Sequence, residues 1–334
     1  MELFNILFSS LIKNKIINAS KIYIYILLFL SLIATYNSIS TEIKVASIPY
    51  IYTLKNSKIR NLTEQNIYGS AFKVNYYYSN IYIGENMQKQ GLILDTGSSI
   101  TTSTCSPLCK SCGKHIRPPY DIQSKQKIIS CSDTKCRMVS SKCKRLNSSE
   151  ECPFSISYSE GSSLNGVFIN ELIRFGKNYK EQKGAYIPIG CTISETHLFL
   201  KQEANGIMGL NNNDYNFVTL LYKLGAIKKN IFSLCFAQLG GIFTLGEINN
   251  KTHTENITFI PMFEEKGKYF KLNIKSILVN GKKLESYNQN QFQPFIDSGT
   301  TISYFENNIF NEILKLTKEE CEKFDKKEAC GKYE

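Results

Sequence analysis

The sequence predicts a mostly β protein built from two similar lobes, and three observations support this fold class. Segments in which apolar and polar residues alternate outnumber helical patterns along the 334-residue chain. A chain of this length is long enough to form two domains with separate cores. A short apolar strand followed by Asp-Thr/Ser-Gly-Ser/Thr occurs twice, as GLILDTGSS at 91–99 and as PFIDSGTT at 294–301. The duplicated motif predicts an approximate two-fold relation between the lobes.

The two aspartates of this motif, Asp95 and Asp297, are the candidate catalytic residues. An aspartate at the end of a buried strand is a costly choice unless its charge is used. Two carboxylates that lie close together cannot both ionise easily, so they share a proton. The charged carboxylate can take a proton from water while the protonated one donates to a carbonyl oxygen. This arrangement hydrolyses peptides without a metal, a cofactor or a covalent intermediate.

The residues around each aspartate fit a supporting role. A single Asp-x-Gly is usually only a turn, but two copies after apolar strands, each followed by hydroxyl residues, favour a site. The glycines would let backbone approach the carboxylates, and the hydroxyl side chains would hydrogen-bond the paired loops. The expected supporting residues are Thr96, Gly97, Ser98, Ser298, Gly299 and Thr300.

The composition limits the other functions of the chain. The net charge of +11 comes mostly from scattered lysines, and 42% of the residues are hydrophobic. Nucleic-acid binding would need a focused basic face or a known module, and the sequence shows neither. We expect no cofactor and no metal site.

The chain has eleven cysteines, seven of which fall between Cys105 and Cys152. The spacing of Cys109 and Cys112 is compatible with zinc, but the other gaps are irregular. An apparent secretory segment precedes them, so disulfides in an oxidising compartment are favoured. The odd total predicts one cysteine that is free or that pairs outside the chain.

The N-terminal region resembles a signal sequence. Basic residues precede a short apolar run, Ile22 to Ala34, which has the length of a signal-peptide core. Residues 1–40 are therefore expected to be a cleaved signal peptide or an uncleaved anchor, and 41–72 an N-terminal extension. A β-meander should start near Lys73, with turns at 84–86 and at Gln90-Gly91. The Asn-x-Ser/Thr sequons permit glycosylation at Asn61, Asn147, Asn250 and Asn256.

From Lys73 onward the sequence resembles the pepsin-type (A1) aspartic proteases. The segments that carry this resemblance are YYYSNIYIGENMQKQGLILDTGSS, FSISYSEGSSLNG at 154–166, NGIMGL at 205–210, LLYKLGAIKKNIFSLCF at 220–236, GGIFTLGE at 240–247 and YFKLNIKSILVNGKKL at 269–284. The resemblance implies a bilobal pepsin-like acid protease fold, with an N-terminal catalytic lobe at 73–255 and a cysteine-rich insert at 105–152. It also implies a partial C-terminal lobe at 256–334.

The segment LCKSCGKHIRPPYD in the insert is similar to that of the plasmepsin V branch, whose members are endoplasmic-reticulum proteases with a nepenthesin-like insert. This resemblance implies cleavage of exported polypeptides after leucine in an Arg-x-Leu motif. It places Tyr158 at the tip of a substrate-covering flap and Glu160 opposite the substrate arginine, with Gly161 and Ser162 beside them. Glu195 could assist Glu160. Two positions depart from the branch, Ser159 and Thr192.

Several expectations follow for the rest of the chain. Asn307 to Leu316 has the pattern of an amphipathic helix, and the family would continue well beyond it, so the second lobe is expected to be incomplete and this chain alone inactive. Membrane association would come from the N-terminal segment or from a C-terminal helix outside this chain. His115, His197 and His253 are expected to be isolated. The alternatives are a general aspartic protease of a vacuole or the extracellular space, and a non-catalytic binding protein of the nepenthesin-like type.

Overall fold

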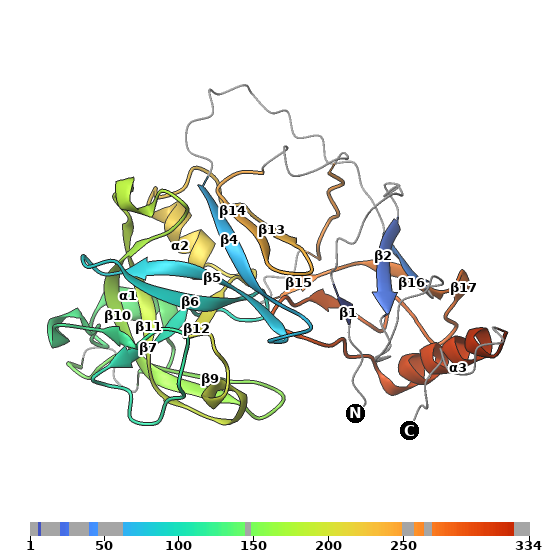
Figure 1. The fold of residues 1–334 in the computed structure, drawn as a ribbon, viewed down its shortest axis with the longest axis horizontal. Helices are drawn as coiled ribbons and strands as arrows, with labels where there is room; N and C mark the ends of the chain where they lie inside the picture. Colours follow the sequence, from blue (N-terminus) through green and yellow to red (C-terminus); the bar gives the residue numbers. More distant parts are fainter. Residues whose placement is uncertain are drawn as a thin grey trace.

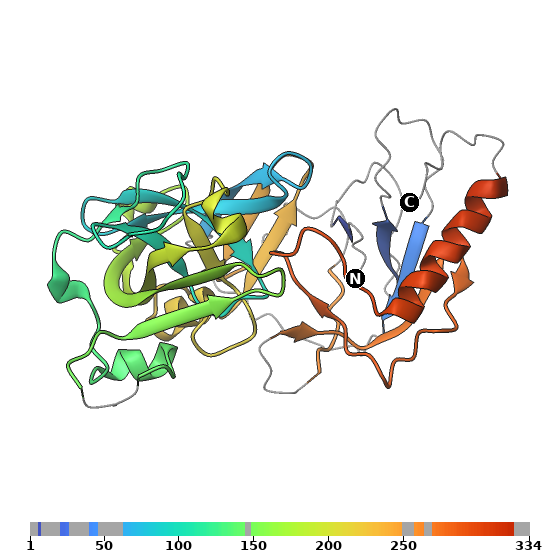
Figure 2. The same cartoon turned by 90° about the horizontal axis from the view of Figure 1, so that it is seen from below.

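The computed structural model describes residues 6–7, 21–26, 40–45, 63–143, 148–248, 257–263 and 269–323. The chain is mostly β, as the sequence predicts. A large first lobe and a smaller second lobe lie side by side (Figures 1 and 2), and the helix α3 (Asn307–Lys323) lies in the second lobe.

The first lobe is built on an eleven-stranded sheet, in which strand β5 also pairs with β10. The strand order is β13-β14-β4-β5-β6-β12-β7-β11-β10-β9, with β8 paired to β7. The strands are β4 (Thr63–Ser70), β5 (Tyr76–Ile83), β6 (Gln88–Asp95), β7 (Thr102–Ser106), β8 (Tyr120–Asp121), β9 (Pro153–Ser157), β10 (Ser163–Arg174), β11 (Ala185–Glu195), β12 (Gly206–Gly209), β13 (Phe232–Phe236) and β14 (Gly241–Leu245). Short helices connect them: η1 (Lys125–Lys127), α1 (Thr134–Val139), η2 (Tyr179–Glu181), η3 (His197–Leu200) and α2 (Phe217–Lys223).

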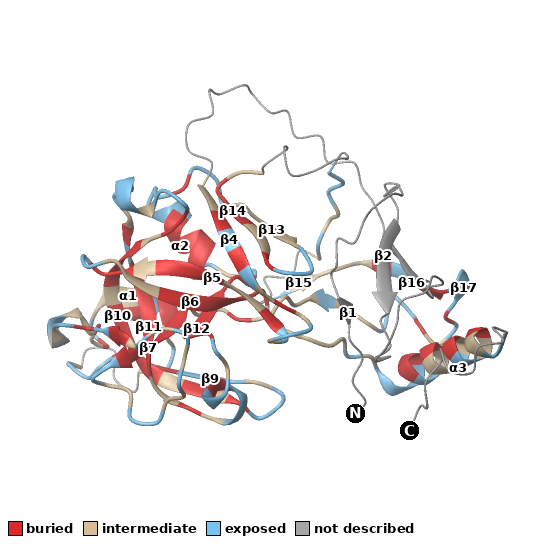
Figure 3. Cartoon of the chain, in the orientation of Figure 1, coloured by how far each residue is buried: buried red, intermediate tan, exposed pale blue. Residues whose placement is uncertain are grey.

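Strand β6 runs through the middle of the first lobe and is buried on both faces. Leu92 and Leu94 belong to one hydrophobic core, and Ile93 between them belongs to a second. Because side chains alternate along a strand, a strand between two cores must be apolar at every position. This explains why the residues before Asp95 show an unbroken apolar run, and Figure 3 shows the burial of this region.

Two details of the meander differ from the sequence-based prediction. The turn around Gly84 is present, but the turn predicted at Gln90-Gly91 is wrong, because both residues lie inside β6. Gln90 is buried there, and its side chain donates to Pro118 O and accepts from Ser103 Oγ. The sheet also includes Thr63–Ser70, which lies within the N-terminal extension predicted at 41–72. Gln65 in that strand is buried and hydrogen-bonds Ser79. The strand was missed because this buried position carries a polar residue instead of an apolar one.

The second lobe contains a smaller core. It comprises β15 (Phe270–Lys271), β16 (Ile274–Val279), β17 (Lys282–Lys283), β18 (Phe295–Ile296) and α3. Apolar residues of β16 and of α3 pack together in one cluster. The helix starts where predicted but continues to Lys323. Strand β16 also pairs with β3 (Ser40–Val45), which pairs with β2 (Lys21–Ile26), and β2 pairs with β1 (Ile6–Leu7).

In the apolar run predicted to be the core of the signal sequence, residues 27–34 lie outside the described residues. The first part of the run, Ile22–Ile26, belongs to β2. The four sequon asparagines also lie outside them. Within the part of the chain that the structure describes, no helix is both long and apolar enough to span a membrane.

The cysteine-rich insert is held by disulfides, as the sequence predicts. Four bridges join described cysteines: Cys105–Cys191, Cys109–Cys112, Cys131–Cys143 and Cys136–Cys152. Cys321 is also disulfide-bonded. Among the described residues, Cys235 on β13 is the free cysteine. These bridges fit a protein of the secretory pathway.

Candidate active site

The two predicted aspartates follow strands whose ends meet between the lobes. Strand β6 ends at Asp95, and β18 ends directly before Asp297. Each motif glycine lies against the carboxylate of the other loop. A Cβ atom on Gly97 would lie 2.6 Å from Asp297 Oδ2, and one on Gly299 would lie 2.5 Å from Asp95 Oδ1. Only glycine leaves room for this approach.

Each carboxylate accepts the same two kinds of hydrogen bond from its own loop. The glycine amide two residues later donates to one oxygen, and the hydroxyl three residues later donates to the other. These donors are Gly97 N (2.7 Å) and Ser98 Oγ for Asp95, and Gly299 N (2.9 Å) and Thr300 Oγ1 (2.6 Å) for Asp297. The matching patterns hold the two carboxylates in equivalent orientations.

Thr96 and Ser298 bind the two loops to each other. Thr96 N donates to Ser298 Oγ at 3.1 Å, and Ser298 N donates to Thr96 Oγ1 at 2.9 Å. Each hydroxyl donates in turn to a carbonyl of the opposite strand. Thr96 Oγ1 donates to Ile296 O at 3.0 Å, and Ser298 Oγ donates to Leu94 O at 2.7 Å. The four bonds cross between segments about 200 residues apart and fix how the two aspartates face each other.

The environment of Asp95 raises its pKa to about 7. Burial is the largest cause, because the residue is only 5% exposed and its charged form loses solvation. The negative charge of Asp297 adds to the shift, and the hydrogen bonds from Ser98 and Gly97 oppose it. Asp95 therefore carries a proton below neutral pH. By comparison, Asp297 is only partly buried.

The predicted flap is a hairpin formed by β9 and β10, and Tyr158 lies at the start of its turn. The Tyr158 hydroxyl is 2.7 Å from Ser98 Oγ, which itself donates to Asp95. The Tyr158 ring meets Phe199 edge-on, with centroids 5.3 Å apart. Burial, followed by the charge of Asp95, raises the Tyr158 pKa well above its usual value, so the phenol stays protonated and can donate to Ser98.

The other predicted flap residues lie at the tip of the hairpin. Glu160 and Gly161 are exposed, and Gly161 adopts a φ of +97°, which favours glycine. Ser162 is fully buried, and its hydroxyl accepts from Leu198 N at 3.2 Å. The tip therefore presents the Glu160 carboxylate to solvent and is anchored at Ser162.

His115 is not isolated, so that prediction is wrong. Its Nε2 lies 2.9 Å from Glu195 Oε2, and both side chains are almost fully buried. Burial alone would lower the His115 pKa, but the hydrogen bond and charge of Glu195 raise it overall. Glu195 also accepts from Gly113 N at 2.8 Å. The pair joins the insert to the end of β11, and a separation of 80 residues gave no sequence signal for it.

The described residues contain one group with metal-ligand geometry, Cys131, Cys136 and Cys143 of the insert. Neither Asp95 nor Asp297 belongs to it. Two carboxyl groups that lie this close can transfer protons to and from a bound water and a substrate.

The fold and the paired aspartate loops are those expected of the bilobal β class of two-carboxylate proteins. A family model described as "Xylanase inhibitor N-terminal" matches residues 77–247, about half of the chain. The chain belongs to the pepsin-like A1 aspartic protease family.

Named relatives agree with this assignment. The chain is 32% identical to plasmepsin V of Plasmodium falciparum over 197 residues, which cover 56% of this chain and 31% of that protein. It is 31% identical to aspartic protease 5 of Toxoplasma gondii over 197 residues, covering 54% and 20%. It is 24% identical to aspartic proteinase 36 of Arabidopsis thaliana over 265 residues, covering 73% and 53%. The chain thus spans about a third or less of the first two relatives.

Proposed function

We propose that the protein is an aspartic endopeptidase in which Asp95 and Asp297 share one proton and activate a water molecule. The observation that carries this proposal is the reciprocal packing of the two loops. Each glycine faces the opposite carboxylate, and Thr96 and Ser298 cross-bond the strands. Such an arrangement has no packing purpose, because it places two like charges together.

The environments of the two aspartates suggest which one starts as the acid. Asp95 is the more buried and has the raised pKa, so it holds the proton. Asp297 then takes a proton from water, whose oxygen adds to the scissile carbonyl carbon while Asp95 protonates the carbonyl oxygen. The tetrahedral intermediate breaks its C–N bond after the nitrogen receives a proton. Both products leave with the atoms of one water added.

The hairpin with Tyr158 would close over the peptide. Its hydroxyl is linked through Ser98 to Asp95, so flap closure and dyad geometry are coupled. A closed flap excludes water and strengthens the polar interactions inside the site.

For the substrate we propose a polypeptide cleaved after leucine in an Arg-x-Leu type motif. The support is the likeness to plasmepsin V together with the exposed Glu160 carboxylate at the flap tip. A carboxylate that becomes desolvated over a bound guanidinium selects arginine by bidentate pairing, which lysine cannot reproduce. Glu195 is an unsuitable helper, because His115 and Gly113 already bind its carboxylate.

We further propose that the protein works in the endoplasmic reticulum, with its catalytic lobes in the lumen and with membrane attachment outside the described residues. The disulfides of the insert support an oxidising compartment.

Cleavage of matched peptides by the complete gene product tests the proposal. A peptide with Arg-x-Leu should be cut after leucine, and its Arg→Lys version should be cut at least about tenfold more slowly. Equal cleavage of both peptides would indicate a general protease rather than one selective for arginine. No cleavage by the wild type, or full cleavage by the Asp95→Ala variant, would remove the proposed mechanism.

A non-catalytic binding protein is the second candidate, and the inhibitor description of the matching family model is the observation that favours it. Titration with a statine-type transition-state mimic separates the two. The proposed enzyme should bind the mimic tightly, and Asp297→Asn should abolish that binding, because the mimic's hydroxyl requires the paired carboxylates. If the protein is instead a binding protein without a working dyad, the wild type and the Asp297→Asn variant should bind the mimic equally.

A further inference from the structure

The buried ring of His115 connects the two ends of one short segment, residues 195–202. Its Nε2 lies 2.9 Å from Glu195 Oε2 at the end of β11, and its Nδ1 lies 2.9 Å from Gln202 O. The His115 side chain is only 1% exposed, so water has little access to either bond. The segment between these two contacts contains η3. We call the ring and its two hydrogen bonds the His115 clamp.

Both atoms that face the ring of His115 are hydrogen-bond acceptors. A backbone carbonyl and a carboxylate can only accept, and Glu195 Oε2 already accepts from Gly113 N at 2.8 Å. A neutral imidazole has one N–H, so it would turn a lone pair toward one of the two acceptors. The imidazolium form donates to both, and the Glu195 carboxylate balances its charge. The complete clamp therefore needs a proton.

The segment that the clamp holds supports the flap hairpin through hydrogen bonds. Thr196 N donates to Ser163 O at 3.1 Å, and Thr196 Oγ1 accepts from Ser163 N at 2.8 Å. Leu198 N donates to Ser162 Oγ at 3.2 Å. Ser162 and Ser163 are the residues with which the hairpin turn ends and β10 begins. A shift of the segment would therefore move the flap turn.

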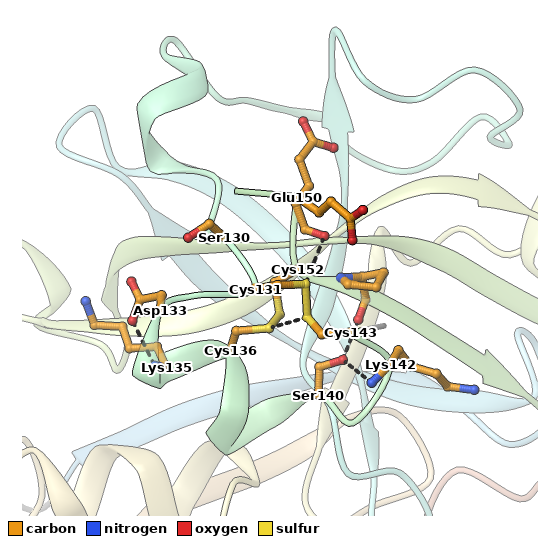
Figure 4. The surroundings of a disulfide bond; sticks show 12 residues. Ser130, Cys131, Asp133, Lys135, Cys136, Ser140, Lys142, Cys143, Glu150 and Cys152 are labelled. Carbon is orange, nitrogen blue, oxygen red and sulfur yellow. Dashed lines mark hydrogen bonds between the residues drawn. A yellow bond between two sulfur atoms is a disulfide. The ribbon is translucent and has the colours of Figure 1, made fainter. Parts of the chain in front are cut away.

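The flap tyrosine also rests on this segment. The Tyr158 ring meets the Phe199 ring edge-on, with centroids 5.3 Å apart. The start of the other strand of the hairpin has a covalent anchor, because Cys152 directly precedes β9 and is bonded to Cys136 (Figure 4). The support beneath Tyr158 depends instead on hydrogen bonds, and the clamp closes both ends of that support.

The insert that carries His115 fits closely against the same segment. A Cβ atom on Gly113 would overlap the backbone of Leu200, so only glycine allows this approach. On the other side of His115, Ile116 N donates to Glu203 O at 2.6 Å. The ring is thus held in place from both sides, and its protonation state changes bonds that the backbone cannot easily replace.

We propose that protonated His115 is a positioning residue, which clamps the ends of residues 195–202 and so holds the flap over the two aspartates. Loss of the proton releases one end of the clamp and loosens the flap. Burial acts to lower the His115 pKa, but the hydrogen bond and charge of Glu195 raise it overall. The contribution of the clamp is full below about pH 6.5, the usual histidine value, and is lost as the pH rises through the raised pKa.

Glu195 is the ionisable side chain that is bonded to the ring among the described residues. The other charged or titratable groups of the insert loop and of the η3 segment are exposed or half-buried, and solvent and salt screen them. They are Lys110, Lys114, Arg117, His197, Lys201 and Glu203. The effect of the clamp on the flap is independent of the proposed peptidase activity, whereas its effect on catalysis rests on that activity.

Hydrogen exchange of the complete gene product, read by mass spectrometry between pH 5 and pH 9, tests the clamp without a substrate. After correction for the intrinsic pH dependence of exchange, protection of residues 195–202 in the wild type should fall at least about tenfold over this range. His115→Phe should be poorly protected at both ends of the range. The paired interior of β10 and β11, residues 167–173 and 185–191, should stay protected and is the internal control. Constant wild-type protection, or a His115→Phe effect of equal size at pH 5 and pH 9, would overturn the proposal.

Three further variants sharpen this test. Glu195→Gln removes the charge that stabilises the imidazolium, so the pH midpoint of the loss should move down by at least about one unit. His115→Gln can donate to Glu195 at every pH, so its protection should be intermediate and independent of pH. His197→Asn, at an exposed position of η3, is the matched control and should behave as the wild type. An unchanged midpoint in Glu195→Gln would contradict the charged clamp.

Activity measurements separate this proposal from the proposed function. With the Arg-x-Leu peptide at pH 6, His115→Phe should lower kcat/KM at least about fivefold, because the flap no longer closes correctly. Asp95→Asn should abolish cleavage and still show the pH-dependent protection of residues 195–202. An enzyme that cleaves the peptide but shows no pH dependence in this protection would refute the clamp and leave the peptidase proposal intact. The pH-dependent protection in a protein that cleaves no peptide would do the reverse.

Discussion

The two halves of the candidate site have the same motif but different surroundings. Strand β6 is buried between two cores, and β12 runs parallel to it, with Gly209 paired to Asp95. The amide of Leu210 donates to Asp95 O at 2.8 Å and secures the loop from behind. Strand β18 is only partly buried, and among the described residues it pairs with β15 alone.

A cavity of about 400 Å³ lies beside Asp297 on the second-lobe side. Apolar residues line it, among them Ile274, Phe305 and Ile309, while Phe295 and Tyr304 nearby are 48% and 45% exposed. The hydrogen bonds that orient each carboxylate come from its own loop and are alike. The degree of burial, which sets the pKa, comes from the rest of the lobe. The comparison teaches that the motif specifies geometry, and packing specifies which aspartate holds the proton.

The largest effect is expected when either aspartate loses its charge. Asp95→Asn and Asp297→Asn should each lower kcat/KM of the complete gene product by about 1,000-fold or more, because proton transfer needs both carboxyl groups. Steady-state kinetics on a cleavable peptide measures this loss. Asp121→Asn, at an exposed position of the first lobe, is the matched control and should retain activity. A large loss in only one of the two dyad variants would show that the halves do not act as a pair.

The same two substitutions should differ in their effect on stability. The pKa of Asp95 in the folded state, about 7, lies above its usual value. The protonated Asp95 carboxyl therefore contributes to the free energy of unfolding. This contribution is fully present below about pH 4 and is lost as the pH rises through about 7. Asp95→Asn removes this loss and should stabilise the protein at pH 8 by a few kcal/mol, on the order implied by a shift of several pKa units.

Denaturant unfolding at pH 4 and pH 8 checks this prediction. Asp95→Asn should gain stability at pH 8 and little at pH 4, and Asp297→Asn should gain less at pH 8. The wild-type kcat/KM should also fall above about pH 7, where Asp95 loses its proton. Equal gains for both variants at pH 8 would mean that burial does not distinguish the two aspartates.

A substitution in the flap should have a smaller effect on kcat/KM, and it should act through Asp95. Tyr158→Phe keeps the ring contact with Phe199 but removes the hydroxyl that lies 2.7 Å from Ser98. We expect kcat/KM to fall about tenfold, the equivalent of one hydrogen bond next to a charged group. The control is Tyr186→Phe, because Tyr186 is exposed and its hydroxyl donates to Glu85. If Tyr158→Phe and Tyr186→Phe have the same activity, the link from the flap to Asp95 has no role.

The smallest effect is expected from substitutions that remove the hydrogen bonds between the Thr96 loop and the Ser298 loop. Thr96→Val removes a donor to Ile296 O and an acceptor for Ser298 N, and should lower the free energy of unfolding by about 1 to 2 kcal/mol. Thr96→Ser restores the hydroxyl and should recover most of the loss. Ser298→Ala should cost a similar amount, and the double variant should cost less than the sum of the two. Additive losses would show that the residues do not act on each other.

Much of the fold was predictable because its signals are local. The mostly β class and the start of α3 follow from strand patterns and amphipathic spacing, and the resemblance to the family placed the flap hairpin. The turn predicted at Gln90-Gly91 failed because buried polar contacts keep that stretch in a strand. The His115–Glu195 pair was missed because two segments distant in sequence create it.

The sequence by itself determined the candidate catalytic residues, since two copies of Asp-Thr/Ser-Gly after apolar strands supply both carboxylates and their hydrogen-bond donors. The tertiary structure alone decided how those groups differ. It buried Asp95 more deeply than Asp297, joined Tyr158 to Asp95 through Ser98, and brought the Cys131–Cys143 and Cys136–Cys152 disulfides into contact. The physical reason is that covalent spacing sets local geometry, whereas solvation and contact depend on what packs around each group.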